Sequence, residues 1–167
     1  NISERPAEVA DRAVPGHWEG DLIMGSTASN SAIGTLVERA TGFVMLLHLP
    51  HGHGALAVQE AMCAAMAELP QTLRRTLTWD QGKEMAAHAR FSVQTGVPVY
   101  FCDPHSPWQR GSNENTNGLL RQYFPKGTDL SIHSQRHLDA VARQMNGRPR
   151  ETLGFRSPAE VLAETLR

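Results

Sequence analysis

The first half of the chain alternates short apolar segments with turn residues, which is the pattern of β-strands. Segments 17–25 (HWEGDLIMG) and 32–38 are bounded by turn residues, and 43–49 (FVMLLHL) is a continuous apolar run of strand length. The tight connections between these three segments predict an antiparallel meander. The unbroken apolar character of 43–49 predicts a central strand that is covered on both faces.

A helical pattern follows. Residues 55–69 are rich in Ala, Met, Leu, Gln and Glu and end at Pro70. Short strands are expected at 75–79 and 97–101, with a helix at 84–95 between them, and further helices from Ser106 onward and at 134–145 and 158–166. This order predicts an α/β fold: a five-stranded mixed sheet, three antiparallel strands followed by parallel strands, flanked by helices.

The domain organisation is expected to be simple. A length of 167 residues fits one domain. Residues 1–15 are polar with two prolines and are predicted to be a linker or arm, while 16–167 form the core. Because the first residue is Asn rather than Met, we expect the chain to be an excerpt of a longer protein. No apolar run reaches the roughly 18 residues of a membrane span, and no signal-peptide pattern is present, so a cytoplasmic protein is expected.

Composition and charge narrow the chemistry only slightly. Cys63 and Cys102 form no CxxC pair and are expected to be free thiols. The net charge is −1, but residues 109–167 hold nine Lys or Arg against six Asp or Glu, a net of +3. A basic C-terminal third beside an acid-rich remainder suits a protein that binds metal in one place and phosphates in another, although ordinary surface scatter would explain so small an asymmetry equally well.

Three carboxylates fall at informative positions. Asp21 lies within the first predicted strand, Asp80 at the end of the fourth, and Glu114 early in the helix after the last strand. If the first and fourth strands are neighbours, Asp21 and Asp80 can approach each other, and a helix that crosses the same edge can present Glu114 to both. Such oxygen ligands suit two Mg²⁺ or Mn²⁺ ions, about 3.5–4 Å apart, that activate an in-line displacement at phosphorus.

Longer motifs surround these acids. The runs TWDQGKE, DPHSPWQRGSNENTNGLLRQYFPKGTDLS and NGRPRETLGFRSPAEVL closely resemble bacterial insertion-sequence transposases of the IS-thirty group, which belong to the retroviral-integrase superfamily. The 33 residues between Asp80 and Glu114 are similar to the spacing of that group. The opening HWEGDLI resembles the segment that carries the group's first Asp, here Asp21.

The resemblance implies a ribonuclease H-like fold and the activity of a DDE transposase. It implies that Asp21, Asp80 and Glu114 bind Mg²⁺ or Mn²⁺, as a pair of ions. Water would first cleave a phosphodiester at an element end, and the freed 3′-OH would then attack target DNA. The implied partners are double-stranded DNA, as terminal repeats and as target, and a second copy of the chain in a homodimer or higher synaptic complex. The resemblance also implies a separate N-terminal helix-turn-helix region and a bacterial, nucleoid-associated location.

Polar residues around the acids are candidates for DNA contact. Glu114, Asn117 and Arg121 share one helix face by their spacing, so Asn117 and Arg121 are expected to face DNA beside the metal site. A solvated helix charge is the plain alternative for Arg121. Glu19 lies two residues before Asp21 and could add a carboxylate. The full set of candidate DNA-binding residues is Lys83, Gln109, Arg110, Asn117, Arg121 and Lys126.

Two other functions remain open at this point. A nuclease of the same fold would hydrolyse nucleic acid without joining strands. A catalytically inactive DNA-binding module would need none of the three acids, so the intact acid triple argues against it.

Overall fold

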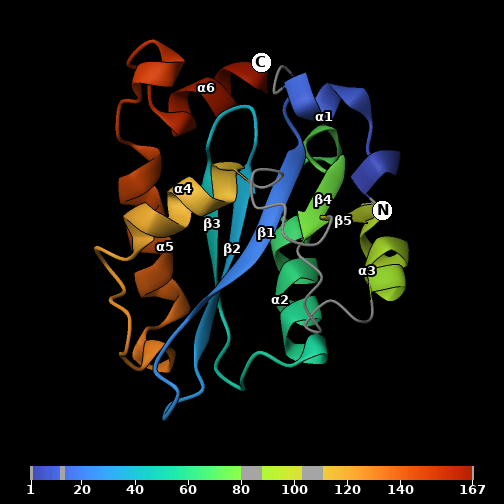
Figure 1. Ribbon diagram of the computed structural model, residues 1–167. Coiled ribbons are helices and arrows are strands. Elements are labelled where there is room, and N and C mark those ends of the chain that lie inside the picture. Colours follow the sequence, from blue (N-terminus) through green and yellow to red (C-terminus); the bar gives the residue numbers. More distant parts are fainter. Residues whose placement is uncertain (1, 12–13, 80–87, 103–110, 167) are drawn as a thin grey trace.

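The chain folds around a five-stranded mixed sheet (Figure 1). The computed structural model describes residues 2–11, 14–79, 88–102 and 111–166, with the backbone alone at 10, 11 and 111–114. The strand order is β3-β2-β1-β4-β5. The strand bounds are β1 (His17–Met24), β2 (Ala32–Glu38), β3 (Val44–His48), β4 (Thr76–Trp79) and β5 (Val99–Phe101).

The pairing directions confirm the predicted topology. β1 pairs antiparallel with β2, with Asp21 opposite Thr35, and β2 pairs antiparallel with β3. β1 also pairs parallel with β4, with Glu19 opposite Thr78, and β4 pairs parallel with β5. The first and fourth strands are therefore neighbours, and β1 is the central strand of the sheet.

The prediction that 43–49 is a central strand is wrong, because β3 lies at the edge of the sheet. Its apolar character has another cause. Leu46 packs in the core beneath α5, and Leu47 packs in the opposite core beneath α2. Coverage on both faces makes an edge strand as apolar as a central one, and hydrophobic pattern alone does not separate the two positions.

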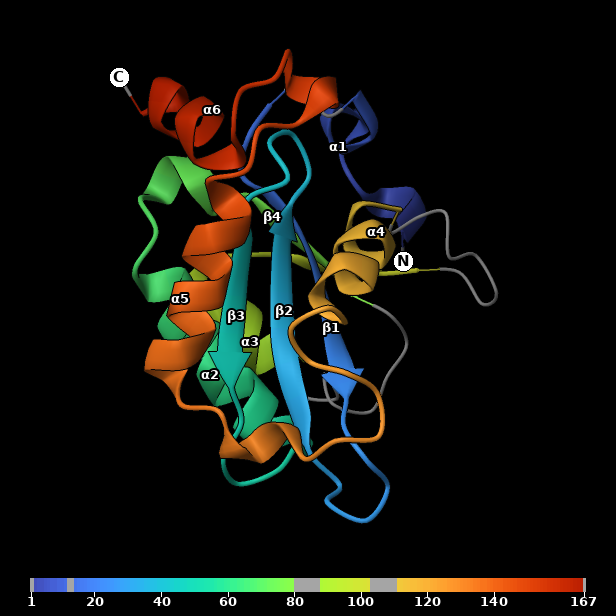
Figure 2. The ribbon, with the colours of Figure 1, turned by 90° about the vertical axis from the view of Figure 1, so that its left-hand side faces the viewer.

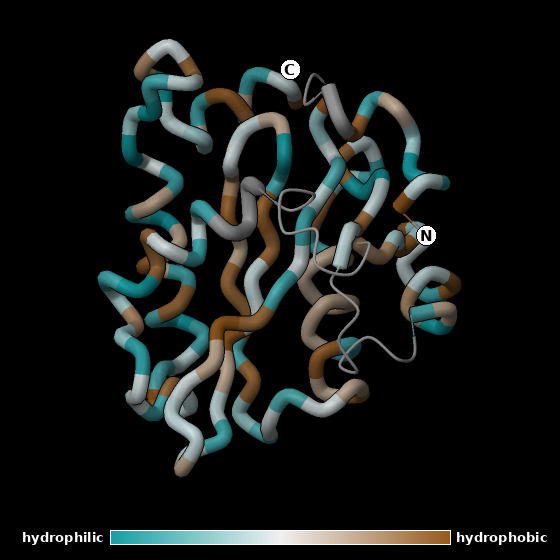
Figure 3. The backbone as a smooth tube through the Cα atoms, in the orientation of Figure 1, coloured by the Kyte–Doolittle hydropathy of each residue, from teal (hydrophilic) through white to brown (hydrophobic). Residues whose placement is uncertain are grey.

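Helices cover both faces of the sheet (Figure 2). On one face lie α2 (Ala55–Ala67) and α3 (His88–Thr95), which bury Met62, Met66 and Phe91 against the strands. On the other lie α4 (Gly111–Leu120) and α5 (Gln135–Asn146), which complete a second core. In Figure 3 the strands between these helices are largely hydrophobic, as burial on both faces requires. The remaining helical segments are α1 (Ala7–Asp11), α6 (Pro158–Thr165) and 3₁₀ turns at Ile2–Glu4, Gln71–Leu73, Leu130–Ile132 and Glu151–Leu153.

The N-terminal segment differs from the expected linker or arm. It contains a 3₁₀ turn and α1, and the side chains of Ile2 and Val9 are buried. Buried His17 ties α1 to the sheet: its Nε2 lies 2.8 Å from Glu8 Oε1 and its Nδ1 lies 2.8 Å from Thr76 Oγ1. Two short helical turns are too brief to show a helical period, so the sequence pattern did not reveal them.

Among the described helices, none has the length and apolar character needed to cross a membrane.

Candidate active site

At the centre of the sheet, the side chain of Trp79 from β4 packs against the backbone of Gly20 in β1. A Cβ atom at Gly20 would lie 2.2 Å from ring carbons of Trp79, so only glycine fits there. The Trp79 ring is fully buried and lies across β1 where Gly20 has no side chain. This packing fixes the position of β1 along the end of β4. It therefore also positions Asp21, the next residue of β1.

Asp21 is held on the face of the sheet that α4 covers. Its Oδ2 accepts a hydrogen bond of 3.0 Å from Nδ2 of Asn117, and its Oδ1 accepts one of 2.8 Å from the backbone N–H of Leu22. The carboxylate is only partly buried. The two hydrogen bonds orient both carboxylate oxygens.

The other side of the Asn117 amide has an unusual environment. Its Oδ1 is buried and has no hydrogen-bond partner among the described residues. A buried amide oxygen without a donor costs about 1–3 kcal/mol, so such atoms are rare in folded proteins. An amide oxygen beside a carboxylate is also a ligand type that hard divalent cations accept, directly or through water.

The other predicted acids are only partly covered by the structure. Asp80, which follows Trp79 in the sequence, lies outside the described residues, as do Lys83, Gln109 and Arg110. Glu114 lies within α4, of which the structure gives the backbone at that position. Across the part of the chain that the structure describes, no group of three or more His, Cys, Asp or Glu side chains could hold a metal.

Two of the candidate DNA-binding residues have defined places in the structure besides Asn117. Nη1 of Arg121 donates to the carbonyl oxygens of Met24 at 3.0 Å and of Phe124 at 3.4 Å. Arg121 therefore joins the end of α4 to the end of β1. Lys126 is exposed in the turn after α4.

Glu19 has a partner of its own. It is fully buried, and its Oε2 accepts a hydrogen bond of 2.8 Å from Nη1 of Arg39, which is itself buried. Arg39 also donates through Nε to the carbonyl oxygen of Val9 at 3.1 Å. The buried ion pair links β1, the turn after β2 and α1, a role that the sequence did not predict because the partner is 20 positions away along the chain.

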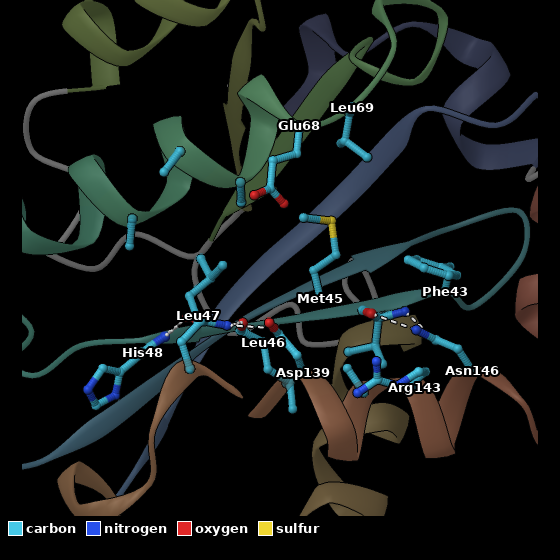
Figure 4. A pocket seen from close by; sticks show the side chains of 16 residues that line it. Phe43, Met45, Leu46, Leu47, His48, Glu68, Leu69, Asp139, Arg143 and Asn146 are labelled. Atoms are coloured by element: carbon cyan, nitrogen blue, oxygen red, sulfur yellow. Dashed lines mark hydrogen bonds between the residues drawn. The ribbon is translucent and has the colours of Figure 1, made fainter. Parts of the chain in front are cut away.

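Away from Asp21, a cavity lies along the free edge of β3. This cavity of about 590 Å³ lies between α2 and α5 (Figure 4). Side-chain amides of α5 bind the outward backbone groups of the edge strand: Asn146 exchanges hydrogen bonds of 2.8 and 2.9 Å with Val44, and Gln135 bonds His48 N–H and the Leu46 carbonyl oxygen, each at 2.8 Å. These amides take the place of a further strand, which protects an edge that would otherwise pair with other chains.

A five-stranded mixed sheet with an aspartate on its central strand and a helix packed beside that aspartate can be compared with known protein families. A family model described as "Integrase core domain" matches residues 11–107, more than half of the chain. The chain belongs to this integrase core domain family.

Curated relatives agree. The chain is 58% identical over 166 residues to the transposase for insertion sequence element IS1086 of Cupriavidus metallidurans, covering 99% of this chain and 48% of that protein. It is 52% identical over 161 residues to transposase InsI for insertion sequence element IS30C of Escherichia coli, covering 96% and 41%. The transposase for IS4351 of Bacteroides fragilis is 38% identical, covering 99% and 50%. The chain thus spans half or less of the length of these relatives.

A solved structure supports the fold. One chain in the cryo-EM structure of the simian T-cell lymphotropic virus intasome in complex with PP2A regulatory subunit B56 gamma superposes with a TM-score of 0.63 at 20% identity, covering 80% of this chain and 49% of that one. The mixed sheet and its helices therefore form a ribonuclease H-like fold, as the sequence predicted.

Proposed function

We propose that the chain is the catalytic core of a DDE transposase, which cleaves DNA at the ends of an insertion element and joins the freed 3′-OH to target DNA. The observation that carries this proposal is the placement of Asp21 on the central strand with α4, the helix that contains Glu114, tied to it through Asn117. Family membership and the transposase names of its relatives support the reaction class.

The three acids are proposed as the metal ligands. Asp80 follows Trp79 directly, at the end of the strand that neighbours β1. Glu114 precedes Asn117 by three residues in α4, a spacing that places two positions on the same helix face. Because Asn117 meets Asp21, we expect Glu114 to face the same site.

The described donors fit a hard divalent cation. The carboxylate of Asp21 and the unpartnered amide oxygen of Asn117 are both oxygen ligands, and no sulfur or imidazole ligand lies between them in the described contacts. Two Mg²⁺ or Mn²⁺ ions, when bound, would supply the positive charge that an in-line displacement at phosphorus needs. The chain's own part is to hold Asp21 in one rotamer through Asn117 and Leu22.

DNA contacts are proposed around this site. Lys83, Gln109, Arg110 and Lys126 would bind phosphates without reading sequence. Asn117 and Arg121 would contribute mainly by holding α4 against β1, because their described bonds are to Asp21, Met24 and Phe124. Joining two element ends would require two catalytic cores, so we also propose a homodimer or higher synaptic complex on the bacterial nucleoid.

Metal binding can be tested without catalysis. In a thermal melt, Mn²⁺ at about 100 times its Kd should stabilise the wild-type chain by about 2.7 kcal/mol, since a ligand of the folded state alone stabilises that state. Asp21→Asn, Asp80→Asn and Glu114→Gln should each remove most of this gain. Glu60→Gln, which removes a carboxylate from the exposed side of α2, is the matched control and should keep it. An unchanged Mn²⁺ response in all three acid variants would refute the assigned ligands.

The reaction class has its own assay. A labelled terminal-repeat duplex is incubated with a target plasmid and Mg²⁺, using the full-length transposase that contains this core. Joined products are expected for wild type and none for Asp80→Asn. Nicks without joined products would indicate the alternative, a nuclease of the same fold.

A further inference from the structure

A second cavity lies beside α4, at the turn between β2 and β3, and Asp21 is not among its lining residues. It has a volume of about 490 Å³ and is enclosed by the β2–β3 turn, α4 and the segment that follows α5. Figures 1 and 2 both place the β2–β3 turn and the segment after α5 at the same end of the molecule. Asn115 and Thr116 line this cavity from α4, whereas Asn117 faces Asp21.

The lining is cationic. Of the lining residues that the structure describes, Arg39 and Arg150 are the charged ones, and no Asp or Glu is among them. Arg39 is neutralised by its ion pair with Glu19. Glu38 adjoins the lining, but its carboxylate accepts hydrogen bonds from the backbone of Gly16 and from Thr41. Arg150 differs from both: among the described residues, no ion pair joins it to an acid at this cavity.

Arg150 also has an unsatisfied donor. Its Nε is buried and has no hydrogen-bond acceptor, and within the described ranges its guanidinium makes no hydrogen bond or ion pair. The neighbouring arginines differ: Arg148 donates to the Tyr123 hydroxyl and lies over its ring, and Arg156 pairs with Glu164 at 2.5 Å. A buried charged donor that costs free energy when unpaired is a binding group for an oxyanion.

The loop that carries Arg150 contains a second unusual feature. Phe155 has a φ of 65°, which bulky residues rarely adopt, and 73% of its surface is exposed. Two backbone hydrogen bonds hold it there, from Phe155 N–H to the Arg150 carbonyl at 2.8 Å and from Arg150 N–H to the Arg156 carbonyl at 2.9 Å. Neither packing nor backbone preference explains an exposed aromatic ring in a strained conformation.

We propose that this cavity binds a phosphate group of the DNA backbone through Arg150, and that Phe155 packs its ring against the adjoining nucleotide. The proposal deepens the proposed function and rests on it for the identity of the ligand as DNA. Hydroxyl and amide groups of Thr152, Thr116 and Asn115 supply neutral hydrogen-bonding partners around the arginine. A cation with neutral donors and an exposed aromatic ring is the usual combination for backbone contact with stacking. An acidic protein surface would satisfy the arginine but leaves the ring unexplained.

The position of the cavity makes it a separate contact. Because Asp21 does not line this cavity, the bound phosphate is not the one that reacts. The contact would instead fix how the duplex lies along α4, and its loss should weaken DNA binding without altering the metal site.

The salt dependence of DNA binding tests the phosphate contact. Binding of a fluorescent 30-base-pair duplex is measured in EDTA over a series of KCl concentrations, so that the metal site takes no part. Arg150→Gln should weaken binding roughly tenfold at low salt and reduce the slope of log K against log [KCl] by about 0.9, the value for one phosphate. Arg136→Gln removes the same charge from an exposed position on α5 and should leave the slope unchanged.

Phe155→Gly separates binding from folding. Glycine relieves the positive φ, so the melting temperature should stay equal or rise while DNA affinity falls several-fold. Wild-type slope and affinity in Arg150→Gln would overturn the proposal. So would a Phe155→Gly variant that binds DNA normally but, in sedimentation, dissociates a dimer of the wild-type chain, because the loop would then be a protein interface. A wild-type chain that shows no thermal stabilisation by Mn²⁺, while Arg150→Gln and Phe155→Gly weaken DNA binding as expected, would count against the proposed metal ligands and leave the phosphate contact standing.

Discussion

Nδ2 of Asn117 lies 3.0 Å from Oδ2 of Asp21, and this hydrogen bond joins α4 to the central strand across 96 positions of sequence. The sequence predicted that Asn117 would face DNA. Its described bond is to the carboxylate, and its remaining oxygen is buried without a partner. Asn117 thus acts on Asp21 as a positioning residue.

Replacing Asn117 by Asp should make the fold depend on metal. The new carboxylate would lie beside that of Asp21, and their repulsion should cost on the order of 1–3 kcal/mol of stability in EDTA. Mn²⁺ should restore much of the loss, so the rise in melting temperature on adding Mn²⁺ should exceed that of the wild type. Asn115→Asp, an exposed position two residues away on the same helix, is the control and should change neither value appreciably. An equal Mn²⁺ response in both variants would contradict the role of Asn117.

The contact of Gly20 with Trp79 should tolerate no side chain. Gly20→Ala places a Cβ about where the Trp79 ring lies, and overpacking of this kind costs about 1–3 kcal/mol or more. Urea denaturation should show a lower midpoint, together with a weaker Mn²⁺ response because β1 and β4 would shift. Gly118→Ala is the opposite case: nothing lies within 4 Å of a Cβ there, and alanine in a helix should stabilise by about 0.5–1 kcal/mol. Equal effects of the two substitutions would argue against the close approach.

The buried pair of Arg39 and Glu19 should behave as a unit. Arg39→Met leaves a buried carboxylate without its arginine, which typically costs about 3–5 kcal/mol. Adding Glu19→Gln removes the unpaired buried charge. The double variant should therefore lose less unfolding free energy than the two single variants lose in sum. Denaturation of all four proteins in a double-mutant cycle measures this coupling. Strict additivity would show that the pair contributes no mutual stabilisation.

Stability should fall in mild acid through His17. Burial lowers the pKa of His17 from its ordinary value of 6.5, and the nearby Arg75 lowers it too, although the hydrogen bond and charge of Glu8 and the charge of Glu38 oppose this. The neutral form is favoured in the fold, so the stabilising contribution is complete above pH 6.5. It is lost progressively as the pH falls from there to the lower pKa of the folded state.

Denaturation midpoints between pH 8 and pH 5 test this dependence. His17→Gln should flatten part of the decline. His51→Gln removes an exposed loop histidine and should leave the decline as in the wild type. Burial and His137 also lower the pKa of His133, so this histidine contributes a loss of stability in acid as well. That part of the loss should remain in both variants. An unchanged profile in His17→Gln would exclude this histidine as the source.

Several features could be predicted from the sequence because they depend on local pattern. The strand segments, the direction of their pairing and the placement of Asp21 within the first strand follow from apolar spacing and connection length. That the first strand lies at the centre of the sheet was decided by the structure. The motifs around Asp80 and Glu114 led to the family before any geometry was available. The roles of Asp80 and Glu114 as ligands stay a prediction.

Other features depend on partners that are distant in the chain. The apolar run at 43–49 predicts burial correctly but not an edge position, because α5 supplies the second cover. Nothing near Glu19 in the sequence points to Arg39. Nothing near Arg150 shows that the neighbouring arginines would have partners while Arg150 has none among the described residues.

The sequence by itself determined the order of strands and helices and the family, because periodicity, turn residues and long motifs are written along the chain. Only the tertiary structure decided which polar groups meet: Asn117 with Asp21, Arg39 with Glu19, and Arg150 with an open cavity. The physical reason is that a polar side chain is satisfied by whichever group the fold brings within about 3 Å, and that distance is set by packing rather than by separation along the chain.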